Sequence, residues 1–545
     1  MVSYDVPLMT DAGRLGEFNR EREAIIGDVE RRVVGRALDR HKRGGDERLE
    51  YVLNEAAYEE LRRLEHARSP EDKKERAAWQ RLSGALARLS DFEKEGELRK
   101  LVHAIAIDIA GNFDPRVWRF ARGVMPVGIA LLGLPERGLL ATVRGGLDQL
   151  RALDRNLRIE GDTERLRALA ARGTLVVVPT HLSNFDSPVI GFALERAGLP
   201  ACTYGAGKNL FTNPFLSYFM HNLGAYRVDR RIRHDLYKDV LKEYSTVLIE
   251  RGFHSLFFPG GTRSRSGGVE GHLKLGLLGT GLTAFGNRAA RGDRRPCAFI
   301  VPVTLNYHLT LEAETLIADH LAEQGKKRYI IEDDESVQGT RILSYMRAAL
   351  RTPGCVVVRF GTPLDPFGNE VDAEGRSHAH DRVVDAASYL DRGGAPGPDA
   401  ARDAEYTRLC GEAISRAFRR DVRFLPTHLV ACALWERMCT AARERDVYRV
   451  LRLARPTPVA LTTLAEDVDR LRDRLRAAPG QAHGLPDSTW DDKDGVSVVE
   501  AAMRSFAAFH PRPPAVMKDG AAQPLQLQAL YYYRNRMAHV PRGVL

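Results

Sequence analysis

The chain has 545 residues, of which 44% are hydrophobic and 28% are charged, and its formal net charge is +9. This balance is ordinary for a folded chain with a sizeable core and room for roughly two to four domains. The excess of basic residues indicates an anionic partner, namely nucleic acid, a phosphorylated substrate or an acidic membrane surface. A basic composition bias without functional meaning stays open at this point.

The cysteines argue against a zinc site and against a disulfide framework, because no CxxC or metal-ligand spacing occurs among them. The six are Cys202, Cys297, Cys355, Cys410, Cys432 and Cys439. The first 15 residues lack a basic region followed by an apolar run, so we expect no signal peptide. The most apolar segment, 123–134, is shorter than the roughly 20 residues that span a bilayer. We expect a buried helix there, and a shallow dip into one leaflet stays open.

The N-terminal part has apolar residues at helical spacing. Residues 11–43 and 46–68 each predict an amphipathic helix, and Ser69-Pro70 opens a third helix that runs towards Asn112. We therefore expect a helical domain over residues 1–160, in which no chemistry is visible.

Between residues 174 and 362, strand and helix patterns alternate, which predicts an α/β fold with a mostly parallel sheet flanked by helices. The expected strands are 174–179, 200–205, 225–229, 254–259, 297–305, 327–331 and 355–360. The expected helices include 187–197, 235–251 and 272–285. Later helices are expected at 401–418, 427–445, 459–476, 497–510 and 522–538. We assign the α/β domain to 161–364, a linker or long loop to 365–400, and a helical C-terminal domain to 401–545.

The stretch TLVVVPTHLSNFDSP, residues 174–188, carries a candidate general base. An apolar run predicts a buried strand, and the polar turn after it presents His181 and Asp186. Ser187-Pro188 then predicts a helix start with Ser187 as the N-cap. An aspartate beside a histidine can accept one ring N–H, fix the tautomer and raise the basicity of the other ring nitrogen.

Spacing alone does not select this histidine, because several others also have an aspartate five residues further on. The pairs are His41/Asp46, His103/Asp108, His181/Asp186, His234/Asp239 and His380/Asp385. His181 differs from the others because it follows a buried strand, and α/β sheets bind their ligands at the carboxyl ends of strands. We therefore take His181 and Asp186 as the candidate catalytic pair.

Basic or glycine-rich turns follow three other expected strands. Residues 205–209, GAGKN, lack part of the P-loop pattern, so we expect no nucleotide site there, but Lys208 suits an anionic ligand. Residues 224–231 end in a basic cluster, and residues 257–266, FFPGGTRSRS, join two glycines to two arginines. Glycine lets the backbone approach a ligand closely, and guanidinium groups bind phosphate oxygens. Together with His181, these turns predict a phosphate site.

The order of these motifs resembles the four-block pattern of the glycerolipid acyltransferases. The blocks are His181-x₄-Asp186, GAYRVDR at 224–230, FFPGGTRSRS at 257–266 and IVPV at 300–303. Further stretches look like the glycerol-3-phosphate acyltransferase branch, namely residues 234–253, 307–312, 356–366 and 530–539. The resemblance covers roughly residues 110–362, with weaker echoes towards the C-terminus.

This resemblance implies a role for each block. His181 would deprotonate the acceptor hydroxyl with Asp186 as its orienting partner, and the oxygen would attack the thioester of acyl-CoA or acyl-carrier protein. No acyl-enzyme and no cofactor is implied, and none of the cysteines lies in a block. The acceptor phosphate would be bound by Arg230, Gly261, Arg263 and Ser264, with Lys208 nearby. Pro302 would help shape the acyl-donor side.

The blocks also depart from the family pattern. Gly260 stands where the third block usually has glutamate, and the loss of that carboxylate would weaken the positioning of Arg263 or shift acceptor preference. Asp229 precedes Arg230 where the glycerol-3-phosphate branch usually has paired arginines, and Thr262 replaces a frequent glycine. The last two features are closer to lysophosphatidate acyltransferases.

We therefore expect an O-acyltransferase of phospholipid biosynthesis that acylates the 1-hydroxyl of glycerol 3-phosphate. It would bind an anionic membrane on the cytoplasmic side as a peripheral or monotopic protein. A lysophosphatidate or other lysophospholipid acyltransferase is one alternative, and a catalytically degenerate acyl- or lipid-binding protein is another. A nucleic-acid partner is not expected, because no stacking aromatic residues interleave the basic clusters.

Overall fold

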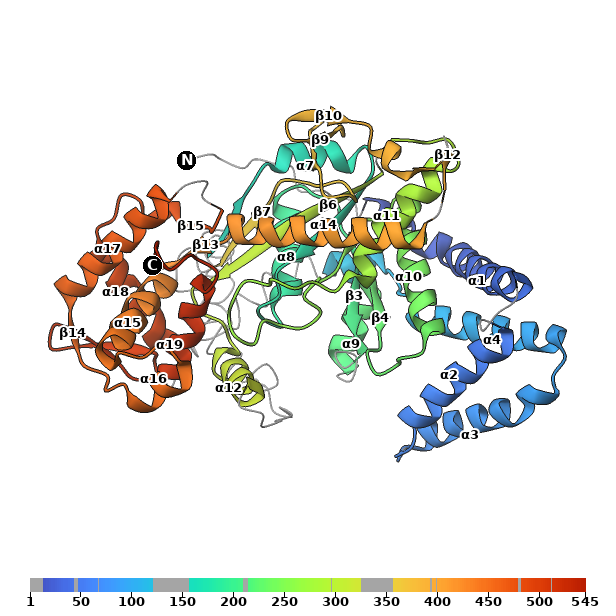
Figure 1. The fold of residues 1–545 in the computed structure, drawn as a ribbon, viewed down its shortest axis with the longest axis horizontal. Coiled ribbons are helices and arrows are strands. Elements are labelled where there is room, and N and C mark those ends of the chain that lie inside the picture. Colours follow the sequence, from blue (N-terminus) through green and yellow to red (C-terminus); the bar gives the residue numbers. More distant parts are fainter. Residues whose placement is uncertain are drawn as a thin grey trace, which may run out of the picture.

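The computed structural model describes residues 13–43, 48–66, 68–120, 156–208, 214–295, 297–324, 356–392, 395–397, 399–478, 482–510 and 512–545. Its centre is a sheet of seven described strands in the order β1-β7-β6-β2-β5-β3-β4 (Figure 1). They span Leu157–Glu160 (β1), Thr174–Pro179 (β2), Thr203–Gly207 (β3), Ala225–Val228 (β4), Ser255–Leu256 (β5), Ala298–Tyr307 (β6) and Val356–Phe360 (β7). Among these strands, only β6 and β7 pair antiparallel. The α/β fold class is confirmed.

Helices cover both faces of the sheet, which explains why β2 is a continuous apolar run. Successive side chains of a strand point to opposite faces. Leu175 and Val177 pack on one face with α7 (Thr163–Ala170) and α8 (Asp186–Arg196). Val176 and Val178 pack on the other face with three helices. These are α10 (Asp235–Glu250), α11 (Leu275–Ala289) and α14 (Ala400–Asp421), and α14 runs across the sheet in Figure 1.

The N-terminal helices pack against α10 and form a core with it. Buried residues of α1 (Phe18–Arg43), α2 (Leu49–Arg63) and α4 (Asp91–Ile109) form this core, whereas α3 (Pro70–Ala85) has no buried residue and packs against α2. Short 3-10 turns lie at Gly13–Glu17 (η1) and Leu86–Arg88 (η2). The prediction of a single helix from Ser69 towards Asn112 is wrong, because the helix is interrupted between α3 and α4. The Ser90 hydroxyl accepts the Glu93 N–H, and the Glu93 carboxylate accepts the Ser90 N–H. This capping box starts a new helix.

The C-terminal helices form a separate core at the left of Figure 1. They are α15 (Pro426–Ala442), α16 (Val447–Leu453), α17 (Leu461–Ala477), α18 (Gly495–Phe509) and α19 (Leu527–Arg534). The 3-10 turn η7 (Ser488–Trp490) lies between α17 and α18, and η8 (Asn535–Met537) follows α19. Short strands join them, namely β13 (Arg423–Phe424), β14 (Val459–Ala460), β15 (Leu485–Pro486), β16 (Ala515–Lys518) and β17 (Ala521–Pro524). The helix expected from 522 therefore begins later, because β17 occupies its first residues. Leu309 and Leu311, which follow β6, belong to the same core and bring it next to the sheet.

The remaining elements are small. Residues 365–400 contain β8 (Glu370–Val371), β9 (Ser377–Ala379), β10 (Arg382–Val384), η5 (Ala386–Leu390), β11 (Asp391–Arg392) and β12 (Ala395–Pro396). Helices α9 (Pro214–Asn222) and α12 (Ala313–Gln324) follow β3 and β6. The expected strand 327–331 and the apolar segment 123–134 lie outside the described residues, and the domain boundaries stay predictions. Among the described helices, none combines the length and apolar character that crossing a membrane requires.

A buried histidine ties the strand β2 to the turn before β5 and makes the fold sensitive to acid. The Nδ1 atom of His254 accepts the Leu175 N–H at 3.0 Å, and burial lowers the pKa of His254 to about 4. Since the unfolded chain takes up this proton near pH 6.5, the stabilisation is present above pH 6.5 and is lost as the pH falls towards 4.

We expect the His254→Asn variant to lose less stability on acidification than the wild type, because the asparagine Oδ1 can accept the same N–H and does not titrate. Between pH 7 and pH 5 the difference is about 2 kcal/mol in the free energy of unfolding. Thermal midpoints of both proteins at the two pH values measure it. An equal fall in both proteins would contradict this role of His254.

Candidate active site

The turns predicted to bind substrate meet at one edge of the sheet. Strands β2, β5, β3 and β4 are neighbours and run parallel, so their carboxyl ends share this edge. His181 follows β2, and residues 257–266 follow β5. Lys208 and Arg230 follow β3 and β4. The carboxyl edge of a parallel sheet is where ligands bind in α/β proteins.

His181 and Asp186 form the predicted pair. The Nδ1 atom of His181 lies 2.8 Å from Oδ2 of Asp186, whose side chain is fully buried. The same oxygen accepts the N–H groups of Leu182 at 2.6 Å and Ser183 at 2.9 Å, and Oδ1 accepts the Tyr307 hydroxyl at 2.7 Å. These donors fix the carboxylate in a position that suits the tautomer of His181 with its proton on Nδ1. In that tautomer the other ring nitrogen, Nε2, carries no proton.

The N-cap of helix α8 lies two residues earlier than the sequence suggests. The N-cap is Phe185 and the first residue of α8 is Asp186, so the expected N-cap at Ser187 is wrong. The Asp186 carboxylate folds back to collect the N–H groups of the preceding turn. Because the positive end of a helix dipole favours an anionic group, the first turn of α8 is a suitable place for this carboxylate.

The backbone and the ring of His181 are also held from the β5 side. Its N–H donates to Oε1 of Glu270 at 2.6 Å, and its carbonyl accepts the Ser264 N–H at 2.7 Å. The imidazole stacks on Phe258, with ring centroids 4.1 Å apart. The side chain of His181 keeps 17% of its surface exposed, so it is accessible from solvent.

A buried glutamate joins the His181 loop to Arg263. The Glu312 side chain is fully buried, and its carboxylate accepts the Ser183 hydroxyl at 2.8 Å and the Asn184 N–H at 3.0 Å. It also lies 3.3 Å from Nη1 of Arg263. Glu312 thereby links Arg263 to the loop that carries His181. The neighbouring Arg265 turns away and pairs with α12, through Asp319 at 3.0 Å and Glu323 at 2.7 Å.

Gly261 lets a lysine cross the turn. Its φ is +75°, and a Cβ built on it would lie 2.6 Å from Cδ and 3.1 Å from Nζ of Lys274. The lysine backbone N–H also donates to the Pro259 carbonyl at 2.7 Å. An ammonium group therefore lies over the same turn as Arg263 and Ser264. Lys274 adds a positive charge that the sequence did not identify.

Lys208 and Arg230 lie at the same sheet edge, where they follow β3 and β4. The Lys208 ammonium is 3.6 Å from Asp229, which also accepts two hydrogen bonds from the Arg231 guanidinium, at 3.0 and 2.8 Å. Burial raises the pKa of the Asp229 carboxyl, but hydrogen bonds from Arg231 and the charge of Lys208 outweigh it and lower the pKa to about 2. Asp229 thus balances two cations, and Arg230 projects beside them as an exposed side chain.

Pro302 lies inside the sheet. It is a buried residue of β6, opposite Val178 of β2, and its carbonyl accepts the Gly361 N–H at 2.8 Å. It therefore belongs to the strand next to the one that delivers His181. Its contribution to the acyl-donor side stays a prediction.

Other residues of the site had weak signals in the sequence or none. Tyr307 and Glu312 lie in a stretch that resembles the glycerol-3-phosphate branch, and Arg536 lies in another. The Arg536 side chain is fully buried and donates to the Leu305 carbonyl at 2.6 Å and to the Asn306 amide oxygen at 3.1 Å. Glu270 and Lys274 follow the third block at positions without any motif.

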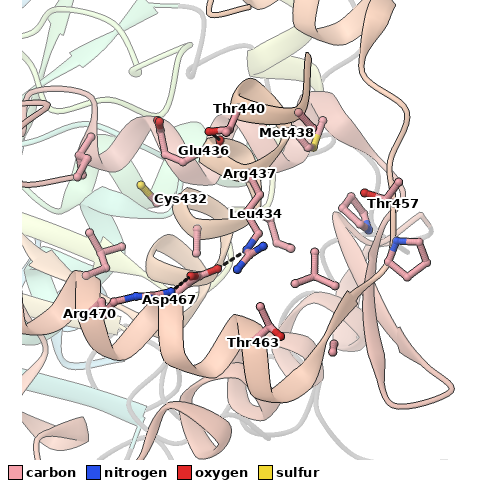
Figure 2. Close-up of a pocket in the computed structure, with 18 of the residues that line it drawn as sticks. Cys432, Leu434, Glu436, Arg437, Met438, Thr440, Thr457, Thr463, Asp467 and Arg470 are labelled. Carbon is pink, nitrogen blue, oxygen red and sulfur yellow. Dashed lines mark hydrogen bonds and ion pairs between the residues drawn. The ribbon is translucent and has the colours of Figure 1, made fainter. Parts of the chain in front are cut away.

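A cavity of about 630 Å³ lies away from this edge, between α15, α17 and the segment that joins α16 to α17. Figure 2 shows Arg437 and Arg470 directed at Asp467 in its wall. None of the site residues predicted from the sequence lines this cavity.

Comparison with known proteins finds similarity to acyltransferases. A family model described as Acyltransferase matches residues 158–305. Residues 158–305 are therefore similar to the acyltransferase family. Over 391 residues the chain is 27% identical to a glycerol-3-phosphate acyltransferase of Pseudomonas paraeruginosa, strain PA7, covering 69% of this chain and 39% of that protein. Over 383 residues it is 28% identical to the protein of the same name from Pseudomonas putida, strain GB-1, covering 69% and 40%.

The resemblance to the glycerol-3-phosphate branch is therefore confirmed, and the chain spans only about two fifths of the length of these relatives. A solved structure, the 1-acyl-sn-glycerophosphate acyltransferase PlsC of Thermotoga maritima, is similar with a TM-score of 0.23 and 16% identity. That similarity covers 46% of this chain and 83% of the other.

We expect Gly261→Ala to destabilise the protein by roughly 1–3 kcal/mol, because the new methyl group meets Lys274 at a φ that L-residues rarely adopt. Chemical denaturation followed by circular dichroism measures the change. Gly191→Ala in α8 is the control, since a Cβ there meets nothing within 4 Å. Equal stability of the two variants would show that the turn does not need glycine.

Proposed function

We propose that this protein transfers a fatty acyl group from a thioester donor to the 1-hydroxyl of glycerol 3-phosphate. The observation that carries the proposal is the hydrogen-bonded unit of His181, Asp186 and the turn that holds Arg263. A general base and a phosphate ligand on one turn suit an acceptor that carries both a hydroxyl and a phosphate. The names of the similar Pseudomonas proteins support the same acceptor.

In this reaction the acceptor hydroxyl gives its proton to Nε2 of His181 while its oxygen attacks the thioester carbonyl. A new C–O bond forms, and the C–S bond breaks as the tetrahedral intermediate collapses. The proton passes from His181 to the departing thiolate, which leaves as a thiol. Asp186 stabilises the imidazolium by hydrogen bonding, and no covalent acyl-enzyme is needed.

The acceptor phosphate would be held by Arg263, with Gly261, Ser264 and the ammonium of Lys274 around it. Lys208 and Arg230 would attract the anion along the sheet edge. The donor is acyl-CoA or acyl-carrier protein, and Pro302 would lie on its side of the site. The net charge of +9 supports docking of the protein on the cytoplasmic face of an anionic membrane.

A lysophosphatidate acceptor is the second candidate, because Asp229-Arg230 replaces paired arginines. Asp229 balances Lys208 and Arg231, which reduces the positive charge available to a small doubly charged phosphate. A test of acceptors decides between these candidates, and a protein that releases no thiol with any of them would be a binding protein instead.

We expect His181→Ala to lower kcat by about 10²–10⁴-fold, because the variant lacks the base that accepts the hydroxyl proton. Thiol release from palmitoyl-CoA in the presence of glycerol 3-phosphate measures it. His378→Ala is a matched control, since His378 also lies 2.8 Å from a carboxylate, that of Asp372, but far along the chain from the four blocks. Full activity of His181→Ala would reject the mechanism.

We expect Arg263→Ala to raise the KM for glycerol 3-phosphate by about 10–100-fold and to leave the KM for acyl-CoA nearly unchanged, because a charged hydrogen bond to phosphate is lost. Arg265→Ala, two residues away and paired with α12, is the control. An unchanged acceptor KM would remove Arg263 from the site.

The wild type should acylate glycerol 3-phosphate faster than dihydroxyacetone phosphate or lysophosphatidate.

A further inference from the structure

The missing carboxylate of the third block has a substitute elsewhere in the chain. A Cβ built on Gly260 would lie 3.1 Å from Cγ and 3.4 Å from Oε1 of Glu270. The Glu270 side chain therefore fills the space that a side chain at position 260 would enter. A glutamate at 260 would place its carboxylate in the same region, because the 3.4 Å from this Cβ to Oε1 of Glu270 is close to the distance from Cβ to Oε within a glutamate side chain.

Glu270 contacts the proposed catalytic residue directly. Its Oε1 accepts the backbone N–H of His181 at 2.6 Å, which is a short hydrogen bond. The loop that carries Glu270 is closed by the hydrogen bond between Lys274 N–H and the Pro259 carbonyl. The position of Glu270 beside Gly260 is thus fixed by the same turn that holds Arg263.

A buried guanidinium balances this carboxylate. Arg536, from the 3-10 turn η8, is fully buried and interacts electrostatically with both Glu270 and Asp186. Within the described residues, Oε2 of Glu270 is buried without a hydrogen-bond partner. Burial raises the pKa of the Glu270 carboxyl, and the His181 N–H and the charge of Arg536 act in the opposite direction.

We propose that Glu270 replaces the carboxylate that is absent at position 260 and acts as a positioning residue, which holds the backbone of His181 in place for acyl transfer. This inference rests on the proposed function. In this interpretation, Gly260 makes room for Glu270 and does not mark a catalytically degenerate site.

The test exchanges the two positions. We expect Glu270→Gly to lower kcat about ten- to hundredfold, with the acceptor KM changed by less than about threefold, because the lost bond positions His181 and does not touch the phosphate. Gly260→Glu alone should also be impaired, since two carboxylates then compete for one space. The double variant Gly260→Glu/Glu270→Gly should regain at least about tenfold over Glu270→Gly. Glu164→Gln, with a side chain 90% exposed on α7, is the control.

Hydrogen exchange of the His181 amide, followed by mass spectrometry, reports the same contact without any activity. We expect faster exchange in Glu270→Gly and recovery in the double variant. If the wild type transfers no acyl group, the proposed function fails while this measurement still tests the contact. Unchanged exchange in Glu270→Gly, or a folded double variant no more active than Glu270→Gly, would overturn the proposal.

Discussion

The buried carboxylate of Asp186 is the constraint on which the site depends. Among the described residues, donors reach it from the His181 ring, from two backbone amides of the same loop and from Tyr307 on β6. A carboxylate without water is stable only when its oxygens are hydrogen-bonded, so each donor must be in place. The ring of His181 therefore has little freedom, and the loop conformation follows from one buried group.

Buried charge also explains how distant segments contribute to the site. Glu312 and Glu270 lie near the same loop, and the positive charges that balance these carboxylates come from Arg263 and Arg536. Arg263 belongs to the acyltransferase-family segment, whereas Arg536 comes from the C-terminal helices. Removing one member of such a set leaves an uncompensated charge in a low-dielectric interior. The sheet edge and the C-terminal helices are thus electrostatically one unit.

Much of this arrangement could be predicted from the sequence. The apolar run 174–179 predicted β2 to the residue, and its place before His181 selected one histidine among five with the same spacing. His103 instead contacts Glu30, and His234 caps α10. The spacing of these histidines to an aspartate five residues further on therefore does not indicate a catalytic pair. Regular periodicity and strand-end position carry this kind of information, because both are local.

The missed features depend on packing between segments. Glu270 and Lys274 have no motif, because their roles arise where a returning loop passes over Gly260 and Gly261. From the sequence alone, Gly260 was interpreted as the loss of a carboxylate, because a motif is compared with the family pattern one position at a time. The break between α3 and α4 did have a local signal, the Ser90/Glu93 capping box, which the longer apolar periodicity obscured.

The burial of Arg536 has a consequence for the order in which the protein matures. Asp186 and Glu270 leave the ribosome long before Arg536, and their carboxylates then lack this guanidinium. Contacts of such large sequence separation form late, after local helices and the nearer strands. The nascent chain thus completes its helices and strands before its buried charges are neutralised. Docking of η8 against β6, through the Arg536 hydrogen bonds to Leu305 and Asn306, therefore brings the charge of Arg536 to Asp186 and Glu270.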